Sequence, residues 1–248
     1  MMIMADAPEA QDQGQQAEKK TPKEPKARKS RAKPAAQFAA GAASAPSFGR
    51  VLLFDKYDYD VEVQDLSLKN YINLKPMSYP STYRRESGKR FSKAGINIVE
   101  RLTNSLMRGG TGGKIGGHII RTKGRLQGKK LKAVHIIESA FTRIQQQTGK
   151  NPLQVLVSAL ENSAPIEDTT RVVYGGIKSN VAVDISASRR LDTALRNIAM
   201  AAIISSFGTR KTLSDALASE LMMAATVDIN SYAIKRKNEI ERMARSAK

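Results

Sequence analysis

The apolar residues of this chain follow two different spacings, and each spacing predicts a different element. From residue 92 onward most apolar residues recur three or four positions apart, which is the period of an amphipathic helix. Within residues 171–190, by contrast, Val172 and Tyr174, and then Val181, Val183 and Ile185, recur at every second position, which is the strand period. We therefore expect a mainly α protein that carries a single β-hairpin.

Six helices are expected, because capping residues and glycines bound each apolar stripe. Their expected starts are, in order, Ser92, about Lys129, Asn151, Ser188, Thr212 and Asn230. The residues expected to face the core are Ile98, Val99, Leu102, Leu106, Val134, Ile137, Phe141, Ile144, Leu153, Leu156, Val157, Leu160, Leu191, Leu195, Ile198, Ala202, Phe207, Leu213, Leu217, Leu221, Ile240 and Met243. These stripes predict a helical bundle.

The hairpin is expected at about residues 169–186, with Gly175 and Gly176 supplying the turn. A two-stranded ribbon is marginal in water when isolated, so this one needs a support. Lys178 lies near its tip, and Arg171, Arg189 and Arg190 lie at its base. The positive charge indicates an anionic support.

The N-terminal part of the chain has a different character. Residues 1–49 are rich in Ala, Gln, Pro and Lys, so we expect a disordered basic N-terminal extension. Residues 19–33 hold eight basic residues and one acidic residue, which fits either a solubilising tail or a phosphate-binding arm. Residues 50–248 are expected to form a single domain that begins with short strands in RVLLF and DYDVEVQ and one or two helical turns in SLKNYINL.

Charge narrows the class of partner. Lys and Arg number 41 against 23 Asp and Glu, which gives a net charge of +18 and favours nucleic acid or an anionic membrane. There is no cysteine, so disulfides and thiolate metal sites are excluded. The first residues lack a signal-peptide core, and the longest apolar run, 198–204, is too short to span a bilayer. We expect a soluble intracellular protein with no membrane partner.

The sequence offers little catalytic chemistry. The glycine-rich segment 109–130 does not match a phosphate-binding loop before Lys114, because Arg108 and Ile115 occupy positions that require Gly and Ser or Thr. It is either a basic loop that grips a nucleic-acid backbone or an exposed linker, and both remain open. His118 and His135 belong to no metal or triad motif, and the carboxylates are scattered. We expect no enzyme activity, no metal and no cofactor.

Two basic clusters are candidates for RNA contact. In residues 79–93 the aromatic side chains of Tyr79, Tyr83 and Phe91 alternate with basic ones, a pattern that can hold phosphates and stack on bases, or simply form a solvated loop. On the fourth helix, Arg189 and Arg196 are seven residues apart and lie on one stripe opposite the apolar face. A solvated helix face is the alternative to RNA contact.

Several long blocks resemble the family of the universal small-subunit ribosomal protein number seven, in its archaeal and eukaryotic branch. They are VERLTNSLMR, NPLQVLVSALENSAPIEDTTRVVYGG, VAVDISASRR, DTALRNIA and SYAIKRKNEIERMA, and LLFDKYDYDVEVQDLSLKNYINLKP resembles the N-terminal segment of that branch. The resemblance covers about residues 50–248. It implies a six-helix bundle with a β-ribbon between the third and fourth helices.

The same resemblance implies a structural constituent of the small ribosomal subunit, located in the cytoplasm. Such a protein binds the 3′ major domain of small-subunit rRNA and nucleates assembly of the head. It lies near exit-site tRNA and the mRNA exit path, beside other proteins of the head and platform. The RNA contacts that it implies are Arg84, Arg85, Lys89, Arg90, Lys93, Lys129, Lys130, Lys132, Arg171, Lys178, Arg189, Arg190, Arg196, Lys235, Arg236 and Lys237.

Two features depart from the family pattern, namely the long segment 109–128 and the basic tail, so their contacts cannot be transferred. Two other functions compete with the ribosomal one. A free nucleic-acid chaperone or DNA-binding protein could use a similar bundle, and a nucleotide hydrolase would require Lys114 to act in the glycine-rich loop.

Overall fold

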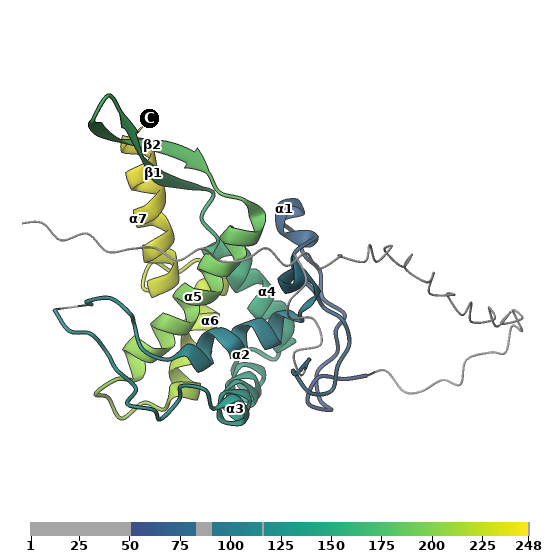
Figure 1. Cartoon of the computed structure of the whole chain (residues 1–248). Helices are drawn as coiled ribbons and strands as arrows, with labels where there is room; N and C mark the ends of the chain where they lie inside the picture. Colours follow the sequence, from purple (N-terminus) through teal and green to yellow (C-terminus); the bar gives the residue numbers. More distant parts are fainter. Residues whose placement is uncertain (1–50, 83–90, 116, 248) are drawn as a thin grey trace, which may run out of the picture. The chain divides into compact units, whose positions relative to one another are not determined.

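The structure is a computed structural model that describes residues 51–82, 91–115 and 117–247 (Figure 1). Its elements are α1 (Leu66–Lys69), a 3₁₀ turn (Ser92–Gly95), α2 (Ile98–Arg108), α3 (Lys130–Thr148), α4 (Pro152–Ser163), β1 (Glu167–Tyr174), β2 (Ile177–Asp184), α5 (Ala187–Ser206), α6 (Leu213–Ala225) and α7 (Tyr232–Ser246). The expected fold class, a mainly α bundle with a projecting hairpin, is confirmed. The disordered extension expected at residues 1–49 lies outside the described residues.

The core lies where α6 packs against α3, α4 and α5, while α2 packs against α5 and α3. Most of the apolar residues that the helical period placed inward are buried there, from Ile98 in α2 to Leu221 in α6. Phe207 is an exception, because it follows the last turn of α5 and is 58% exposed. Met243 is also exposed, because the buried face of α7 is formed by Ala233, Ile234 and Ala244. Both residues were wrongly assigned to the core.

Helix starts follow the side chains that can cap them. Asn151 accepts a hydrogen bond from the Leu153 N–H (3.0 Å), and Pro152 occupies the first turn of α4 as expected. Two other predicted caps were displaced. Asn97, rather than Ser92, caps α2, because Ser92 begins a separate 3₁₀ turn, and Ser231, rather than Asn230, caps α7.

The segment before α1 does not form the short strands expected there. Its only ladder contact among the described residues is a single antiparallel bridge between Leu53 and Tyr57. Farther along, its backbone bonds to α4: the N–H groups of residues 64 and 65 donate to Glu161 Oε1 at 2.7 and 3.0 Å, and Gln154 accepts from the Glu62 N–H at 3.0 Å. Side chains of a helix therefore satisfy the groups that a neighbouring strand would have paired.

The hairpin leaves the bundle between α4 and α5, as expected, and its first strand packs against α7 (Figure 1). Gly175 and Gly176 form a two-residue turn with φ values of 56° and 80°, a geometry that disfavours residues with a side chain. In the observed register Tyr174 pairs with Ile177, and Val172 with Ser179. The pairing runs from Glu167 opposite Asp184, so the ribbon begins slightly earlier than the periodicity indicated.

Candidate nucleic-acid interface

The two basic residues of the hairpin lie on one face of the ribbon. Arg171 and Val173 are two residues apart on β1, and Lys178 is the cross-strand partner of Val173. Because cross-strand partners point to the same side of a ribbon, Arg171 and Lys178 share that face as diagonal neighbours. Both side chains are exposed, so the hairpin presents paired positive charge to solvent.

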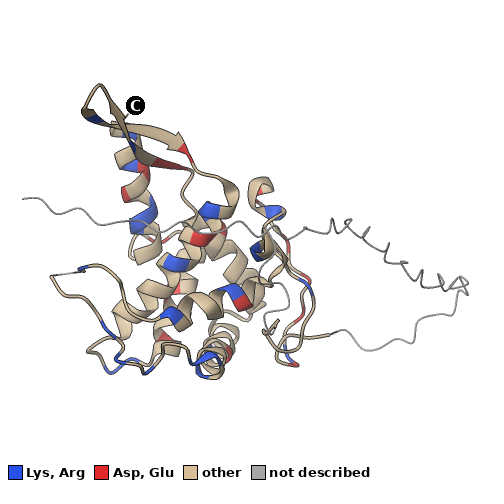
Figure 2. Cartoon of the chain, in the orientation of Figure 1, with Lys and Arg blue, Asp and Glu red and all other residues tan. Residues whose placement is uncertain are grey.

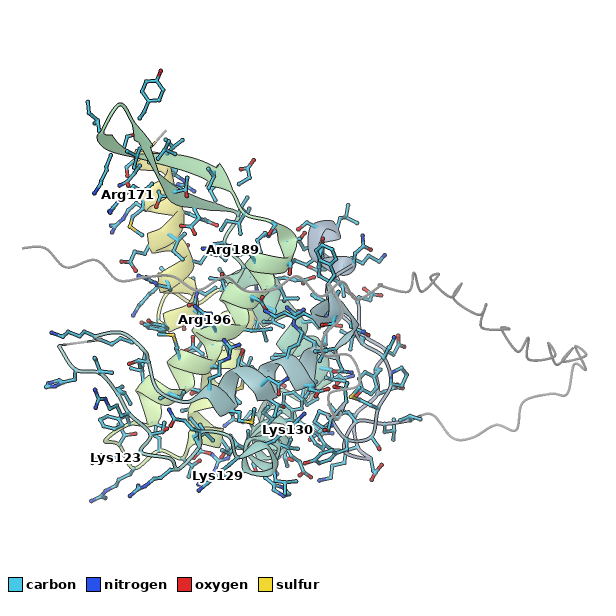
Figure 3. The ribbon with its side chains drawn as sticks, viewed as in Figure 1. Lys123, Lys129, Lys130, Arg171, Arg189 and Arg196 are labelled. Carbon is cyan, nitrogen blue, oxygen red and sulfur yellow. The ribbon has the colours of Figure 1, made fainter. Side chains whose placement is uncertain are left out.

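Positive charge continues from the hairpin along α5. Arg189 is 70% exposed, and its guanidinium lies 3.4 Å from Asp168 at the base of β1. Arg196, two turns later, is exposed and has no ion-pair partner among the residues that the structure describes. Figure 3 shows Arg171, Arg189 and Arg196 following one another from the hairpin along α5. We call Arg171, Lys178, Arg189 and Arg196 the basic strip.

Arg190 does not belong to this strip, although it was expected to contact RNA. Its side chain is only 11% exposed, and it faces the start of α1. The guanidinium donates to Asp65 Oδ2 (2.9 Å), to the Pro165 carbonyl oxygen (3.2 Å) and to Ser67 Oγ. These protein acceptors occupy its Nε, Nη1 and Nη2 donors, so we assign Arg190 to the scaffold. The double arginine therefore combines one exposed cation with one structural cation.

A carboxylate on α5 is similarly occupied. Asp192 accepts from Arg101 Nη2 (2.9 Å) and from Lys93 Nζ (3.1 Å). Burial acts to raise the pKa of Asp192, but the hydrogen bonds and charges of Arg101 and Lys93 outweigh it and hold the pKa below its ordinary value. The carboxylate stays ionised, and the positive charges of Arg101 and Lys93 balance its negative charge. Lys93 is thus an expected RNA contact that already has a protein partner, on an exposed side chain.

The start of α3 holds three lysines with different environments. Lys129 and Lys132 are exposed, as an RNA contact requires. Lys130 instead donates to Oε1 of Glu100 (2.6 Å), whose side chain is only 3% exposed. Glu100 also accepts from Thr82 through its backbone N–H and its hydroxyl. Lys130 therefore neutralises a buried carboxylate and joins α3 to α2.

The loop between α2 and α3 is basic throughout. Figure 2 shows its Lys and Arg residues with no Asp or Glu between them. The exposed cations of the loop are Lys114, Arg121, Lys123 and Arg125. The loop follows a helix rather than a strand, so it lacks the strand-to-helix setting of a phosphate-binding loop. Its geometry does not support the hydrolase hypothesis and suits contact with a nucleic-acid backbone.

The three basic residues of α7 also differ. Lys235 is exposed, whereas Arg236 pairs with Glu239 one turn later. Lys237 donates to the backbone carbonyl oxygen of Asn162 at 2.9 Å, which ties α7 to α4. Only Lys235 has no such tie among the described residues.

The remaining expected contacts, Arg84, Arg85, Lys89 and Arg90, lie outside the described residues. Of the other twelve, the structure brings Arg171, Lys178, Arg189 and Arg196 onto the basic strip and places Lys129 and Lys132 beside the basic loop.

A groove that the sequence did not reveal lies between α2 and α5. It has a volume of about 440 Å³, and its lining includes Lys93, Arg108, Leu195, Arg196, Ala199 and Ile203. Arg108 ends α2 and is exposed, so it faces solvent across the groove from α5. We call this hollow the α2–α5 groove. The sequence signal that could have pointed to Arg108 is the pair of glycines after it, because they end α2 at that residue beside the groove.

Among the described positions, no group of three or more His, Asp or Glu side chains is placed to hold a metal ion. No helix in that part of the chain is long and apolar enough to cross a membrane.

A comparison with protein families complements this geometry. The family described as Ribosomal protein S7p/S5e matches residues 68–248, which include α2 to α7 and the hairpin. The match spans well over half of the chain and confirms the resemblance seen in the sequence blocks. The chain therefore belongs to the ribosomal protein S7p/S5e family, and it is a structural rRNA-binding protein of the small ribosomal subunit.

Proposed function

We propose that this protein binds the 3′ major domain of small-subunit rRNA and nucleates assembly of the subunit head. In the assembled subunit it lies beside other proteins of the head and platform, near exit-site tRNA and the mRNA exit path, in cytoplasmic ribosomes. It acts by positioning RNA, with no chemical step of its own.

The observation that carries the proposal is the basic strip on a rigid scaffold. Phosphates are bound when exposed cations replace their condensed counterions. Arg171, Lys178 and Arg196 have no acidic partner among the described residues, and the Arg189 pair is exposed and weak. Such cations are available to phosphates. Cations that are already buried or paired, such as Arg190 and Lys130, join elements of the scaffold instead.

The hairpin provides a second argument. Tyr174 and Ile177 pair across its end, and Val172, Val181 and Val183 occupy the same face of the ribbon. All five are exposed, with Tyr174 at 86%. A ribbon with an uncovered apolar face is weakly stabilised alone. In our proposal this arm meets folded RNA and its neighbours, which supply the packing that the isolated chain lacks.

The proposal is tested by titrating the full-length protein with a fragment of the 3′ major domain at several salt concentrations. With about six phosphate contacts, the logarithm of the affinity should fall by roughly four to five units per logarithmic unit of salt. Replacing Arg189 and Arg196 together by Gln should weaken binding and reduce the slope by roughly 1.5.

The matched control is Arg143→Gln on α3, because Arg143 is exposed but already lies 2.7 Å from Asp215 and off the strip. It should leave the slope unchanged. A flat salt response of the native protein would reject RNA binding by this surface.

Assembly is tested separately by reconstituting small subunits from rRNA and purified proteins. Omitting this protein should leave particles without the other head proteins, and restoring it should recover them. The protein should also sediment with the small subunit in a sucrose gradient, whereas a free chaperone would stay near the top. Normal head assembly in its absence would contradict the proposal.

A further inference from the structure

The α2–α5 groove is poorly suited to phosphate alone. Its floor is apolar, formed by side chains that include Leu195, Ala199 and Ile203 on α5. Its volume of about 440 Å³ falls within the range of roughly 300–1,000 Å³ that is typical of pockets for small molecules. A phosphate is strongly hydrated and gains nothing from an apolar floor. The groove therefore fits a flat organic group better than an anion.

The rim of the groove has the opposite character. Arg108 stands at the end of α2 and Arg196 on α5, so cations border the hollow on two of its walls. The one acidic residue of the lining, Asp192, is neutralised by Arg101 and Lys93. An apolar floor inside a cationic rim is complementary to a base flanked by its own phosphates. An aliphatic side chain of a protein would gain nothing from the rim.

Polar groups are present where a base edge would lie. Asn104 and Ser105 line the α2 wall, and both are partly exposed. Neither side chain makes a hydrogen bond with the rest of the described protein. Unstacked bases are commonly held by hydrogen bonds to their edges together with stacking on Arg or aromatic groups. A second hollow of about 360 Å³ adjoins the groove through Arg196 and Asp192 and is also lined by Arg189, which extends the cationic rim toward the basic strip.

We propose that the α2–α5 groove holds one unstacked base of the rRNA, with Arg108 and Arg196 contacting the phosphates on either side of it. This inference rests on the proposed rRNA-binding function and deepens it. Through the groove the protein would recognise local RNA structure as well as phosphate charge, because only a nucleotide outside a helix can enter the groove.

The test fills the groove without removing a charge. Ser105→Phe places a ring in the hollow, and Ser158→Phe on α4, outside the groove, is the matched control. With a 3′ major-domain fragment, Ser105→Phe should bind roughly tenfold more weakly, while Ser158→Phe binds like the native protein. The salt slope of Ser158→Phe should equal that of the native protein, and the slope of Ser105→Phe should fall by no more than roughly 1.4–1.8, because only the two phosphate contacts of Arg108 and Arg196 depend on the base. Asn104→Phe on the same wall serves if Ser105→Phe fails to fold by circular dichroism.

A scan of abasic positions in the RNA completes the test. At one position, an abasic nucleotide should weaken binding to the native protein by roughly the same tenfold factor. The same abasic nucleotide should not weaken binding to the filled variant any further. Native-like binding by both filled variants, or abasic losses that are equal in native and filled proteins at every position, would overturn the groove proposal alone. The proposed function would still stand if the native salt slope were steep. A flat salt slope of the native protein would contradict both the proposed function and the groove proposal.

Discussion

Replacing Arg190 by Met should destabilise the protein, whereas the same change at Arg189 should not. Methionine keeps much of the length of the side chain, so the variant removes mainly the guanidinium and its hydrogen bonds. Arg190 donates to Asp65, Pro165 and Ser67 with a side chain that is 11% exposed. Breaking a buried ion pair by removing one partner costs about 3–5 kcal/mol.

The expected cost lies near the lower end of that range. The side chain of Asp65 is 27% exposed, so water can rehydrate its carboxylate once Arg190 is gone. The Pro165 carbonyl oxygen, on a buried residue, is harder to rehydrate. We therefore expect the free energy of unfolding to fall by about 3 kcal/mol. For a domain of this size that corresponds to a melting temperature lower by about 6–12 °C.

The assay is thermal and urea unfolding of both variants, followed by circular dichroism. Arg189→Met should change the stability by less than about 0.5 kcal/mol, because its ion pair is exposed and long. In rRNA titrations the roles should reverse: Arg189→Met should lower the salt slope by about 0.7–0.9, and Arg190→Met should leave it unchanged under conditions where it is folded. Equal melting temperatures for the two variants would refute the assignment of Arg190 to the scaffold.

Three further outcomes are expected. Hydrogen bonds from Ser67 and the charge of Arg190 outweigh burial and hold the pKa of Asp65 below its ordinary value of 3.8, so the pair contributes fully above that pH and is lost as pH falls through the lowered pKa. The stability gap between native protein and Arg190→Met should accordingly narrow in urea titrations at low pH, and a constant gap would contradict this. Glu220→Ala should lower the free energy of unfolding by about 2 kcal/mol and speed hydrogen exchange in α7. The reason is that buried Glu220 Oε1 accepts hydrogen bonds from the Ser231 hydroxyl (2.7 Å) and the Ala233 N–H (2.9 Å) at the start of that helix. Lys130→Met should destabilise by about 3 kcal/mol by leaving a buried carboxylate without its ammonium partner, whereas exposed Lys132→Met should be nearly neutral in the same unfolding assay.

Local patterns specified most of the architecture. Helical spacing identified the buried faces of α2 to α6, because a residue every three or four positions has to face the same side of a helix whatever surrounds it. Strand spacing with Gly175 and Gly176 identified the hairpin, since a two-residue turn with positive φ favours glycine. The pattern was misleading where residues far away in the sequence took the hydrogen bonds that it predicted. The segment before α1 alternates like a strand, yet Glu161 and Gln154 of α4 take its backbone hydrogen bonds.

The basic surface shows the same division. The sequence determined how many cations the chain carries, that they cluster at the hairpin exit and before α3, and that the chain resembles a ribosomal protein family. It did not distinguish Arg189 from Arg190, or Lys130 from Lys132, because neighbouring residues of one type differ only in what the fold places against them. Burial beside Asp65 or Glu100 turns a cation into part of the scaffold, and exposure leaves it to bind RNA. That choice, like the α2–α5 groove itself, depends on elements far apart in the chain, so only the tertiary structure could decide it.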